Sequence, residues 1–224
     1  MKHSLIITAG GIGKRMEDKT PKQFLNLNDK PILLHTLELF YAFNPLFEII
    51  ITLPSDWISH WESLIKTHEV KIPHKVVKGG KERFHSIKNA IKKSTGKVVW
   101  IHDGVRPLVS NQTLNKLLLD INNFDAVIPC LKIKESLREI KQDLTYPINR
   151  DKIIIVQTPQ VFKREVIKKS YETSYESSFT DDASLVQENG YEIKTIDGNQ
   201  ENIKITNPKD LLFAETFIKS LNNK

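Results

Sequence analysis

The most constraining feature of this sequence is a regular alternation between short apolar runs and amphipathic helical patterns. The apolar runs are rich in Ile and Val, and they lie at Leu5–Ile7, Glu48–Leu53, His74–Val77, Val98–Ile101 and Ala126–Pro129. Helical patterns lie between them, at Ile32–Phe43, Ser55–Thr67, Arg83–Lys93 and Asn111–Asn122. Short runs that are apolar on both faces are typical of parallel strands covered by helices. The alternation predicts an α/β fold with a doubly wound, mostly parallel sheet, in which ligands bind beyond the carboxyl ends of the strands.

The length and composition of the chain fit one soluble domain. Its 224 residues are 39% hydrophobic and 27% charged, which is ordinary for a globular protein, and we expect a single domain over residues 1–224. No apolar run approaches the roughly 18 to 20 residues of a membrane span, and the apolar stretch before the first glycines is too short for a secretory signal. We therefore expect a cytoplasmic protein without membrane contact. The one cysteine, Cys130, excludes an intrachain disulfide.

The chain is basic, and the distribution of its charge indicates the kind of ligand. The net charge is +6, from 33 Lys and Arg against 27 Asp and Glu, which favours anionic ligands. Nucleic-acid-binding proteins usually gather such charge on one face or arm with interleaved aromatic residues. Here the lysines are scattered, and the densest groups lie beside glycine loops. This distribution favours phosphorylated small molecules over nucleic acid.

One segment breaks the alternation of strands and helices. Residues 132–155 alternate polar and apolar side chains around a turn-like Lys141-Gln142-Asp143 sequence, which predicts two antiparallel strands. An isolated hairpin is only marginally stable in water and needs a surface to pack on. The main sheet and the same hairpin of a second subunit are both candidates for that surface. We expect residues 132–155 to form a protruding β-arm.

The last apolar pattern follows Asn207-Pro208, a sequence that typically opens a helix. Its apolar residues recur at helical spacing and predict one face that docks on the sheet. They are Leu211, Leu212, Ala214, Phe217, Ile218 and Leu221.

A basic, glycine-rich loop follows the first apolar run, in the sequence TAGGIGKRMEDKTPKQF from Thr8 to Phe24. Glycines in such a turn let backbone amides approach phosphate groups. The dinucleotide-binding glycine pattern is incomplete, and Arg15 stands where a P-loop would have Ser or Thr. Arg15 and Lys22 lie seven residues apart. Two such cations could hold a triphosphate from two sides, or they could be solvated surface charges.

Two further polar clusters follow apolar runs. Gly79 and Gly80 precede a predicted helix, where backbone groups and the hydroxyl of Ser86 can read the edge of a base. Asp103 and Arg106 lie in HDGVRP, directly after a predicted strand. A carboxylate beside a triphosphate suits Mg²⁺, which prefers one or two carboxylates with phosphate oxygens and water. We assign Asp103 to Mg²⁺ or another divalent cation, and expect Arg106 to bind a second substrate or to pair with Asp103.

Five motifs occur in order along the chain. They are AGGIGKRM…PKQF near the N-terminus, GGKERFHSIKNA at Gly79–Ala90, HDGVRP at His102–Pro107, TPQVF with TDDAS within Thr158–Ser184, and NIKIT at Asn202–Thr206. Together they resemble the nucleotidyltransferases, and among these the 2-C-methyl-D-erythritol 4-phosphate cytidylyltransferase family of the non-mevalonate isoprenoid pathway. The resemblance covers nearly the whole chain. It implies a Rossmann-like nucleotidyltransferase fold and a homodimer formed through the arm at 132–155.

The resemblance also implies roles for single residues. CTP binding is implied for Ala9, Gly10, Gly11, Gly13, Gly80, Ser86 and Asp103. Arg15 and Lys22 would stabilise the transition state, and Arg150 and Lys204 would position the attacking phosphate, with Arg150 able to act in the neighbouring subunit. Substrate binding is implied for Arg106, Ser136 and Thr180, and Thr180 is also expected to cap the helix that follows it.

The implied reaction joins CTP and 2-C-methyl-D-erythritol 4-phosphate into 4-diphosphocytidyl-2-C-methyl-D-erythritol and pyrophosphate. The phosphate would attack the α-phosphorus of CTP in line, without a protein nucleophile, because a phosphate monoester is largely ionised at neutral pH. Three alternatives stay open at this point. They are a cytidylyltransferase for another polyol phosphate such as ribitol 5-phosphate, a hydride-transferring dinucleotide enzyme, and a noncatalytic module that binds nucleic acid.

Overall fold

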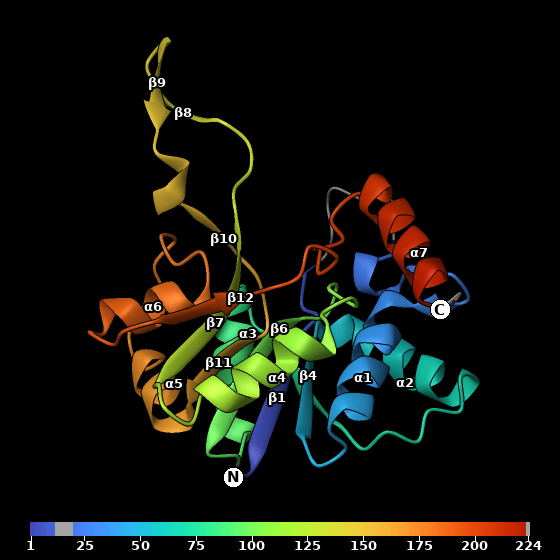
Figure 1. Cartoon of the computed structure of the whole chain (residues 1–224). Helices are drawn as coiled ribbons and strands as arrows, with labels where there is room; N and C mark the ends of the chain where they lie inside the picture. The colour runs from blue at the N-terminus through green and yellow to red at the C-terminus, as the bar shows by residue number, and fades with distance from the viewer. Residues whose placement is uncertain (12–19, 223–224) are drawn as a thin grey trace.

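The computed structural model describes residues 1–11 and 20–222 and is built on an eight-stranded sheet. Seven of its strands follow the order β10-β7-β11-β6-β1-β4-β5, and β12 pairs with β7 (Figure 1). Their bounds are β1 His3–Thr8, β4 Glu48–Leu53, β5 Lys75–Lys78, β6 Val98–Asp103, β7 Ala126–Lys132, β10 Ile154–Val156, β11 Gln160–Lys163 and β12 Lys194–Asp197. The five predicted strands are all present, with ends that differ from the prediction by three residues at most.

The centre of the sheet is parallel and one side of it is mixed. β1 pairs in parallel with both β4 and β6, and β4 pairs in parallel with β5. On the other side of β6, β11 and β10 are antiparallel to their neighbours, whereas β12 runs parallel to β7. The predicted α/β fold with a mostly parallel sheet is therefore confirmed. The carboxyl ends of β1 and β6 lie side by side, because Thr8 is in register with Asp103.

Alternate residues of the central strands face two separate apolar cores. Leu5 and Ile7 of β1 belong to one core with α1 (Ile32–Phe43), α4 (Asn111–Asp120) and Trp61 of α2 (Ile58–Thr67). Ile6 belongs to the other, with α3 (Arg83–Lys93), α5 (Arg164–Ser170) and α6 (Asp182–Glu188). The period-two alternation of a strand places successive side chains on opposite faces, so a run that is apolar at every position needs helices on both sides.

The helices agree closely with the predicted ones. α1 and α3 have the predicted bounds, whereas α4 ends two residues earlier than expected. The predicted helix Ser55–Thr67 begins as a 3₁₀ turn, η2 (Ser55–Trp57), before α2. Two other 3₁₀ turns are η1 (Lys22–Phe24) and η3 (Arg150–Lys152). None of the described helices has the length and apolar character needed to cross a membrane.

The predicted hairpin is present and projects away from the main sheet (Figure 1, top). The expected range 132–155 is too wide, because Lys132 of β7 pairs with Ile154 of β10 within the main sheet. The hairpin consists of β8 (Leu137–Lys141) and β9 (Leu144–Ile148), which pair antiparallel. The turn between them passes through Gln142, whose φ is +53°. Several of its large apolar side chains are exposed, with Ile140 at 74% and Leu144 at 64%.

The last helix, α7 (Pro208–Asn222), does not dock on the main sheet as expected. It packs on a small third core that holds Leu27 and Ile32, beside the two-stranded ribbon of β2 (Asn26–Leu27) and β3 (Lys30–Pro31). The predicted apolar face is also too wide, since Leu212 is 64% exposed. Ile205, in the loop before α7, belongs to the same core.

Candidate active site

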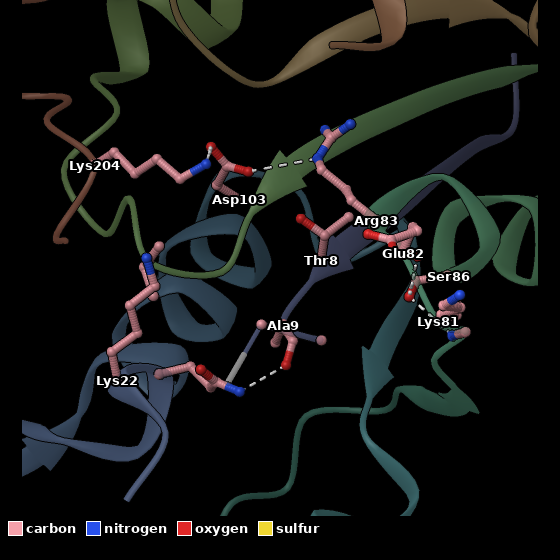
Figure 2. Close-up of a pocket in the computed structure, with 14 residues that line it drawn as sticks. Thr8, Ala9, Lys22, Lys81, Glu82, Arg83, Ser86, Asp103 and Lys204 are labelled. Carbon is pink, nitrogen blue, oxygen red and sulfur yellow. Dashed lines mark hydrogen bonds and ion pairs between the residues drawn. The ribbon is translucent and has the colours of Figure 1, made fainter. Parts of the chain in front are cut away.

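A cavity of about 490 Å³ opens at the carboxyl ends of β1 and β6 (Figure 2). Eight of the residues singled out in the sequence line it, namely Ala9, Gly10, Gly11, Lys22, Gly80, Ser86, Asp103 and Lys204. They come from segments that are far apart in the chain but meet at one edge of the sheet, as expected for a doubly wound fold. The other two predicted residues of the glycine loop, Gly13 and Arg15, lie outside the described residues.

The start of the glycine loop is fixed by hydrogen bonds to the scaffold. The backbone N–H of Ala9 donates to the carbonyl of Thr52 in β4 at 3.1 Å. The buried side chain of Gln23 donates from Nε2 to the carbonyl of Ala9 at 2.7 Å. Gln23 adjoins Lys22 in η1, so this bond also ties the segment that carries Lys22 to the end of β1.

Ser86 shapes the wall of the cavity opposite the glycine loop. Its hydroxyl accepts from the backbone N–H of Gly80 at 3.0 Å and donates to the carbonyl of Glu82 at 3.2 Å. The proton that was expected to read a base is therefore directed at the protein backbone. The Cβ of an alanine at Gly10 would lie 3.3 Å from Ser86 Oγ. The glycine thus lets the two walls of the cavity approach each other closely.

Asp103 is the electrostatic centre of the site. Its side chain is 8% exposed, and its Oδ2 lies 3.0 Å from Arg106 Nε and 3.2 Å from Lys204 Nζ. Its Oδ1 lies 3.9 Å from Arg83 Nε, and Figure 2 shows Lys204 and Arg83 reaching the carboxylate from opposite sides. Burial alone would raise the pKa of Asp103, but the charges of Lys204, Arg83 and Arg106 hold it well below its usual range. The carboxylate is therefore ionised at neutral pH, and the expected pairing of Arg106 with Asp103 is present.

A buried histidine holds the strand end that carries Asp103. His102 is fully buried, and burial lowers its pKa to about 4, so the ring is neutral. Its Nε2 lies 2.9 Å from the carbonyl of Arg106, which can only accept, so Nε2 carries the proton. Nδ1 then accepts from the hydroxyl of Thr158 at 3.0 Å, and that hydroxyl accepts from the backbone N–H of Asp103 at 3.1 Å. This chain of bonds fixes the turn from Asp103 to Arg106.

A second cavity, of about 320 Å³, adjoins the first. The two cavities share Arg83, Asp103 and Lys204 in their walls. Arg106 and Thr180, both expected to bind a second substrate, line this cavity. Two molecules bound in the two cavities would therefore meet at the same three charged side chains.

The role expected of Thr180 as a helix cap is wrong. The cap of α6 is Asp181, whose side chain accepts from the backbone N–H of Ser184 at 2.9 Å. An aspartate also favours a helix N-terminus through its charge, which a threonine one residue earlier cannot do. Thr180 is exposed and lines the second cavity.

Two residues expected at the site do not reach it within one chain. Arg150 and Ser136 are both exposed and lie at the base of the arm, and neither lines the two cavities. The guanidinium of Arg150 donates to the carbonyl of Lys134. The structure therefore brings together Lys22, Lys204, Asp103 and Arg106, but not Arg150 and Ser136.

Known proteins of one family match this chain over nearly its whole length. A sequence model described as 2-C-methyl-D-erythritol 4-phosphate cytidylyltransferase matches residues 3–220. The chain belongs to this cytidylyltransferase family. The family member from Phocaeicola vulgatus is 40% identical over 219 residues, which cover 97% of this chain and 100% of the relative. The member from Bacteroides thetaiotaomicron is 41% identical over 220 residues, with 97% and 100% covered.

Solved structures of cytidylyltransferases of this family share the fold. The crystal structure of 4-diphosphocytidyl-2C-methyl-D-erythritol synthase from Anaerococcus prevotii has a TM-score of 0.83 at 28% identity, and the match covers 97% of this chain and 96% of the other. The Francisella tularensis 2-C-methyl-D-erythritol 4-phosphate cytidylyltransferase has a TM-score of 0.79 at 28% identity, covering 96% and 99%. These matches confirm the resemblance inferred from the five motifs, and with it the nucleotidyltransferase fold.

One oxygen of Asp103 in this cytidylyltransferase has the chemistry to hold a divalent cation. Among residues 1–11 and 20–222, no group of three or more His, Cys, Asp or Glu side chains could hold a metal ion. Mg²⁺ does not need such a group, because it is commonly bound by one or two carboxylates together with substrate phosphates and water. Within the described part of the chain, Oδ2 has two close cations, whereas Oδ1 has only Arg83 at 3.9 Å. The donor set therefore fits the expected Mg²⁺.

Two residues of the site, Arg83 and Gln23, were not among those predicted from the sequence. Both line the main cavity, and Arg83 lines the second cavity as well. A signal for Arg83 was available, since it is the first residue of α3. A cation in the first turn opposes the helix dipole, so it indicates a nearby carboxylate or an anionic ligand. Gln23 gave no such signal, because its partner, the carbonyl of Ala9, becomes adjacent only through folding.

Proposed function

We propose that this chain transfers a cytidylyl group from CTP to 2-C-methyl-D-erythritol 4-phosphate and releases pyrophosphate, in isoprenoid precursor synthesis. One observation carries the proposal beyond family membership. Two adjoining cavities share Arg83, Asp103 and Lys204. A triphosphate in one cavity and a phosphate monoester in the other would meet where positive charge is concentrated. That arrangement suits a transfer between two anions, which otherwise repel each other.

The larger cavity is the place for CTP. Its glycine walls, at Gly10, Gly11 and Gly80, give a ligand access to backbone groups. Lys22 lines the same cavity, and we assign it, with Arg15, to the charge that develops around the α-phosphorus. An oxygen of the acceptor phosphate would form the new P–O bond while the bond to the β-phosphate oxygen breaks. The protein supplies orientation and charge neutralisation, as is general for phosphoryl-group transfer.

The second cavity is the place for the acceptor. Lys204 and Arg106 carry the positive charge that would hold its phosphate, and the exposed hydroxyl of Thr180 is available to its polyol. Arg150 and Ser136 would complete this cavity from a second subunit, since they lie on the arm and away from the cavities of their own chain. The functional unit that we propose is thus a homodimer joined through residues 132–155.

We also propose that the reaction uses Mg²⁺ held by Asp103. When bound at Asp103, such a cation would neutralise negative charge on the phosphates of CTP and on the leaving pyrophosphate. The residues of the chain have separate tasks in this arrangement. Arg106 and Lys204 keep Asp103 ionised and in place, and the bond from Thr158 to His102 fixes the strand end that carries it.

A panel of acceptors tests the proposed function. The protein is supplied with CTP, Mg²⁺ and one polyol phosphate at a time, and pyrophosphate release and the cytidylated product are measured. We expect product with 2-C-methyl-D-erythritol 4-phosphate. Product with ribitol 5-phosphate but not with methylerythritol phosphate would replace the proposed acceptor, and no product with any member of the panel would contradict the proposal as a whole.

A further inference from the structure

An ion pair between a partly exposed arginine and a buried aspartate links the two helices that border the site. Arg83 opens α3, and its two terminal nitrogens donate to Asp182 of α6 in a fork, at 2.9 Å from Nη1 to Oδ1 and 2.6 Å from Nη2 to Oδ2. The hydroxyl of Tyr171 donates to the same Oδ1 at 2.5 Å. Asp182 is fully buried and Tyr171 is 3% exposed. Burial raises the pKa of Tyr171 well above its usual value, and the charge of Asp182 raises it further, so its proton stays in place.

Fold stability is a weak reason for this ion pair. Replacing a buried ion pair with apolar residues of similar volume is often neutral or stabilising, because desolvation offsets the attraction. The helix that carries Asp182 is already held by other bonds, since Gln160 of β11 donates to Asp181 at 2.7 Å and accepts from the N–H of Ala183 at 3.0 Å. The position of Arg83 points to another role, because its guanidinium lines both cavities of the site.

The two hydrogen bonds from Arg83 to Asp182 determine which nitrogen of Arg83 faces Asp103. A guanidinium offers five N–H donors, two on each terminal nitrogen and one on Nε. Asp182 takes one from each terminal nitrogen, which leaves Nε toward Asp103 at 3.9 Å from Oδ1, beyond hydrogen-bond length. Arg106 and Lys204 both approach Oδ2 instead. Among the described residues, Oδ1 is consequently the oxygen of Asp103 that no cation approaches within hydrogen-bond length.

We propose that Asp182, supported by Tyr171, is a positioning residue that holds Arg83 away from Asp103 and so keeps Oδ1 of Asp103 open for the metal–nucleotide complex. The inference rests on the proposed function, because it assigns Oδ1 to a divalent cation bound with CTP. Without Asp182, the guanidinium has one other carboxylate within ion-pair distance among the described residues, and that is Asp103. Arg83 would then form the forked pair with Asp103 that Asp182 now prevents.

The first experiment compares Asp182→Asn with Glu48→Gln as a matched control. Glu48 is also a shielded carboxylate in an ion pair, with Lys75, but it lies at the opposite end of the strands from the site. Binding of Mn²⁺ in the presence of CTP is followed by electron paramagnetic resonance, and folding by circular dichroism. We expect both variants to fold, and Asp182→Asn to bind Mn²⁺ about tenfold or more weakly, as for lost support of a metal ligand. Glu48→Gln should bind it like the wild type.

A second substitution separates positioning from a general structural role. In the double variant Asp182→Asn/Arg83→Met, no guanidinium is present to occupy Asp103, and neither buried charge is left without a partner. We expect Mn²⁺ binding in the presence of CTP to recover most of the loss caused by Asp182→Asn. Tyr171→Phe removes one hydrogen bond but keeps the fork, so its effect should have the same direction and be several-fold smaller.

Two outcomes would overturn this inference. One is wild-type Mn²⁺ affinity in folded Asp182→Asn, and the other is a double variant that binds Mn²⁺ no better than Asp182→Asn alone. A failure of the proposed function is distinguishable, since it would appear in the wild type as absence of CTP-dependent Mn²⁺ binding or of product. The variants are compared in a protein whose wild type shows both CTP-dependent Mn²⁺ binding and product formation.

Discussion

Asp103 shows how a single residue of this site depends on its surroundings. Its carboxylate is almost fully shielded from solvent, yet three cations keep it ionised, and its backbone N–H donates to the hydroxyl of Thr158. Removing any one partner would leave buried charge or a buried donor less well compensated, which is costly in a medium of low dielectric constant. We therefore expect substitutions around Asp103 to affect stability as well as activity, whereas those at the rim should affect activity alone.

Lys22 lines the main cavity and is only partly buried, so we expect its substitution to act mainly on activity. We expect Lys22→Ala to lower turnover at least about a hundredfold, because removal of one group that stabilises developing charge typically costs that much. The circular dichroism spectrum should match that of the wild type. Lys163→Ala is a suitable control, because Lys163 pairs with Asp125 on the surface and lines neither cavity. Near-normal turnover in a folded Lys22→Ala variant would remove Lys22 from the mechanism.

Glu48 predicts a pH dependence of stability that is separate from catalysis. Burial alone would raise its pKa, but hydrogen bonds from Lys75, Ser4 and Thr95 outweigh this and lower it from 4.5 to about 2. A carboxylate with a lower pKa in the folded state contributes stability that is complete above its unfolded pKa and is lost as the pH falls toward the folded pKa. The free energy of unfolding should therefore differ most between wild type and Glu48→Gln above pH 5.

The measurement is a series of urea unfolding curves for both proteins between pH 6 and pH 3. The difference between them should shrink as the pH falls below about 4.5, because Glu48 titrates in the wild type and the amide that replaces it in the variant does not. A difference that stays constant over this range would show that the hydrogen bonds of Glu48 do not depend on its charge.

At the scale of elements, the arm is the part of the fold that makes no contact explaining its role among the described residues of a single chain. Its hairpin exposes Ile140 and Leu144, and a two-stranded hairpin alone is marginal in water. The arm also carries Ser136 and its base carries Arg150, the two residues that reach neither cavity of their own chain. Both facts are accounted for if the arm packs against a second copy of the chain.

The arm therefore predicts a specific effect on assembly. We expect the wild type to sediment as a dimer and the double variant Ile140→Lys/Leu144→Lys to sediment as a monomer, since it places charges in an apolar contact. Leu212→Lys/Phe213→Lys is the matched control, because these α7 side chains are similarly exposed, at 64% and 61%, but lie away from the arm. A monomeric wild type, or a dimer that survives the arm substitutions, would contradict the proposed interface.

At the scale of the whole molecule, the proposed homodimer has two composite sites. Each would take Lys22 from one subunit and Arg150 from the other, so Lys22→Ala and Arg150→Ala should each be nearly inactive alone. Mixed dimers of the two variants contain one site that is damaged twice and one that is intact. We expect them to recover up to about half of the wild-type activity per dimer, because independent sites contribute additively.

The mixed dimers are best prepared with two different affinity tags, so that their composition is verified before turnover is measured. Each homodimeric variant provides the baseline. If purified mixed dimers are no more active than these baselines, Arg150 does not act across the dimer.

The sequence alone determined the bounds of several elements and three of the charged residues that line the main cavity. The bounds of β4, α1 and α3 were predictable because strand and helix periodicities are local properties of the chain. Lys22, Asp103 and Lys204 were identifiable because each lies in a motif that resembles the family.

Only the tertiary structure decided how these parts meet. The insertion of antiparallel β11 between β6 and β7, and the pairing of Arg83 with Asp182 across 99 residues, leave no periodic signal in the sequence. Such contacts depend on which distant segments pack together. The packing of distant segments is decided by burial and by the pairing of buried charges over the whole chain, and no local pattern records it. The convergence of two cavities on Asp103 is a property of this packing.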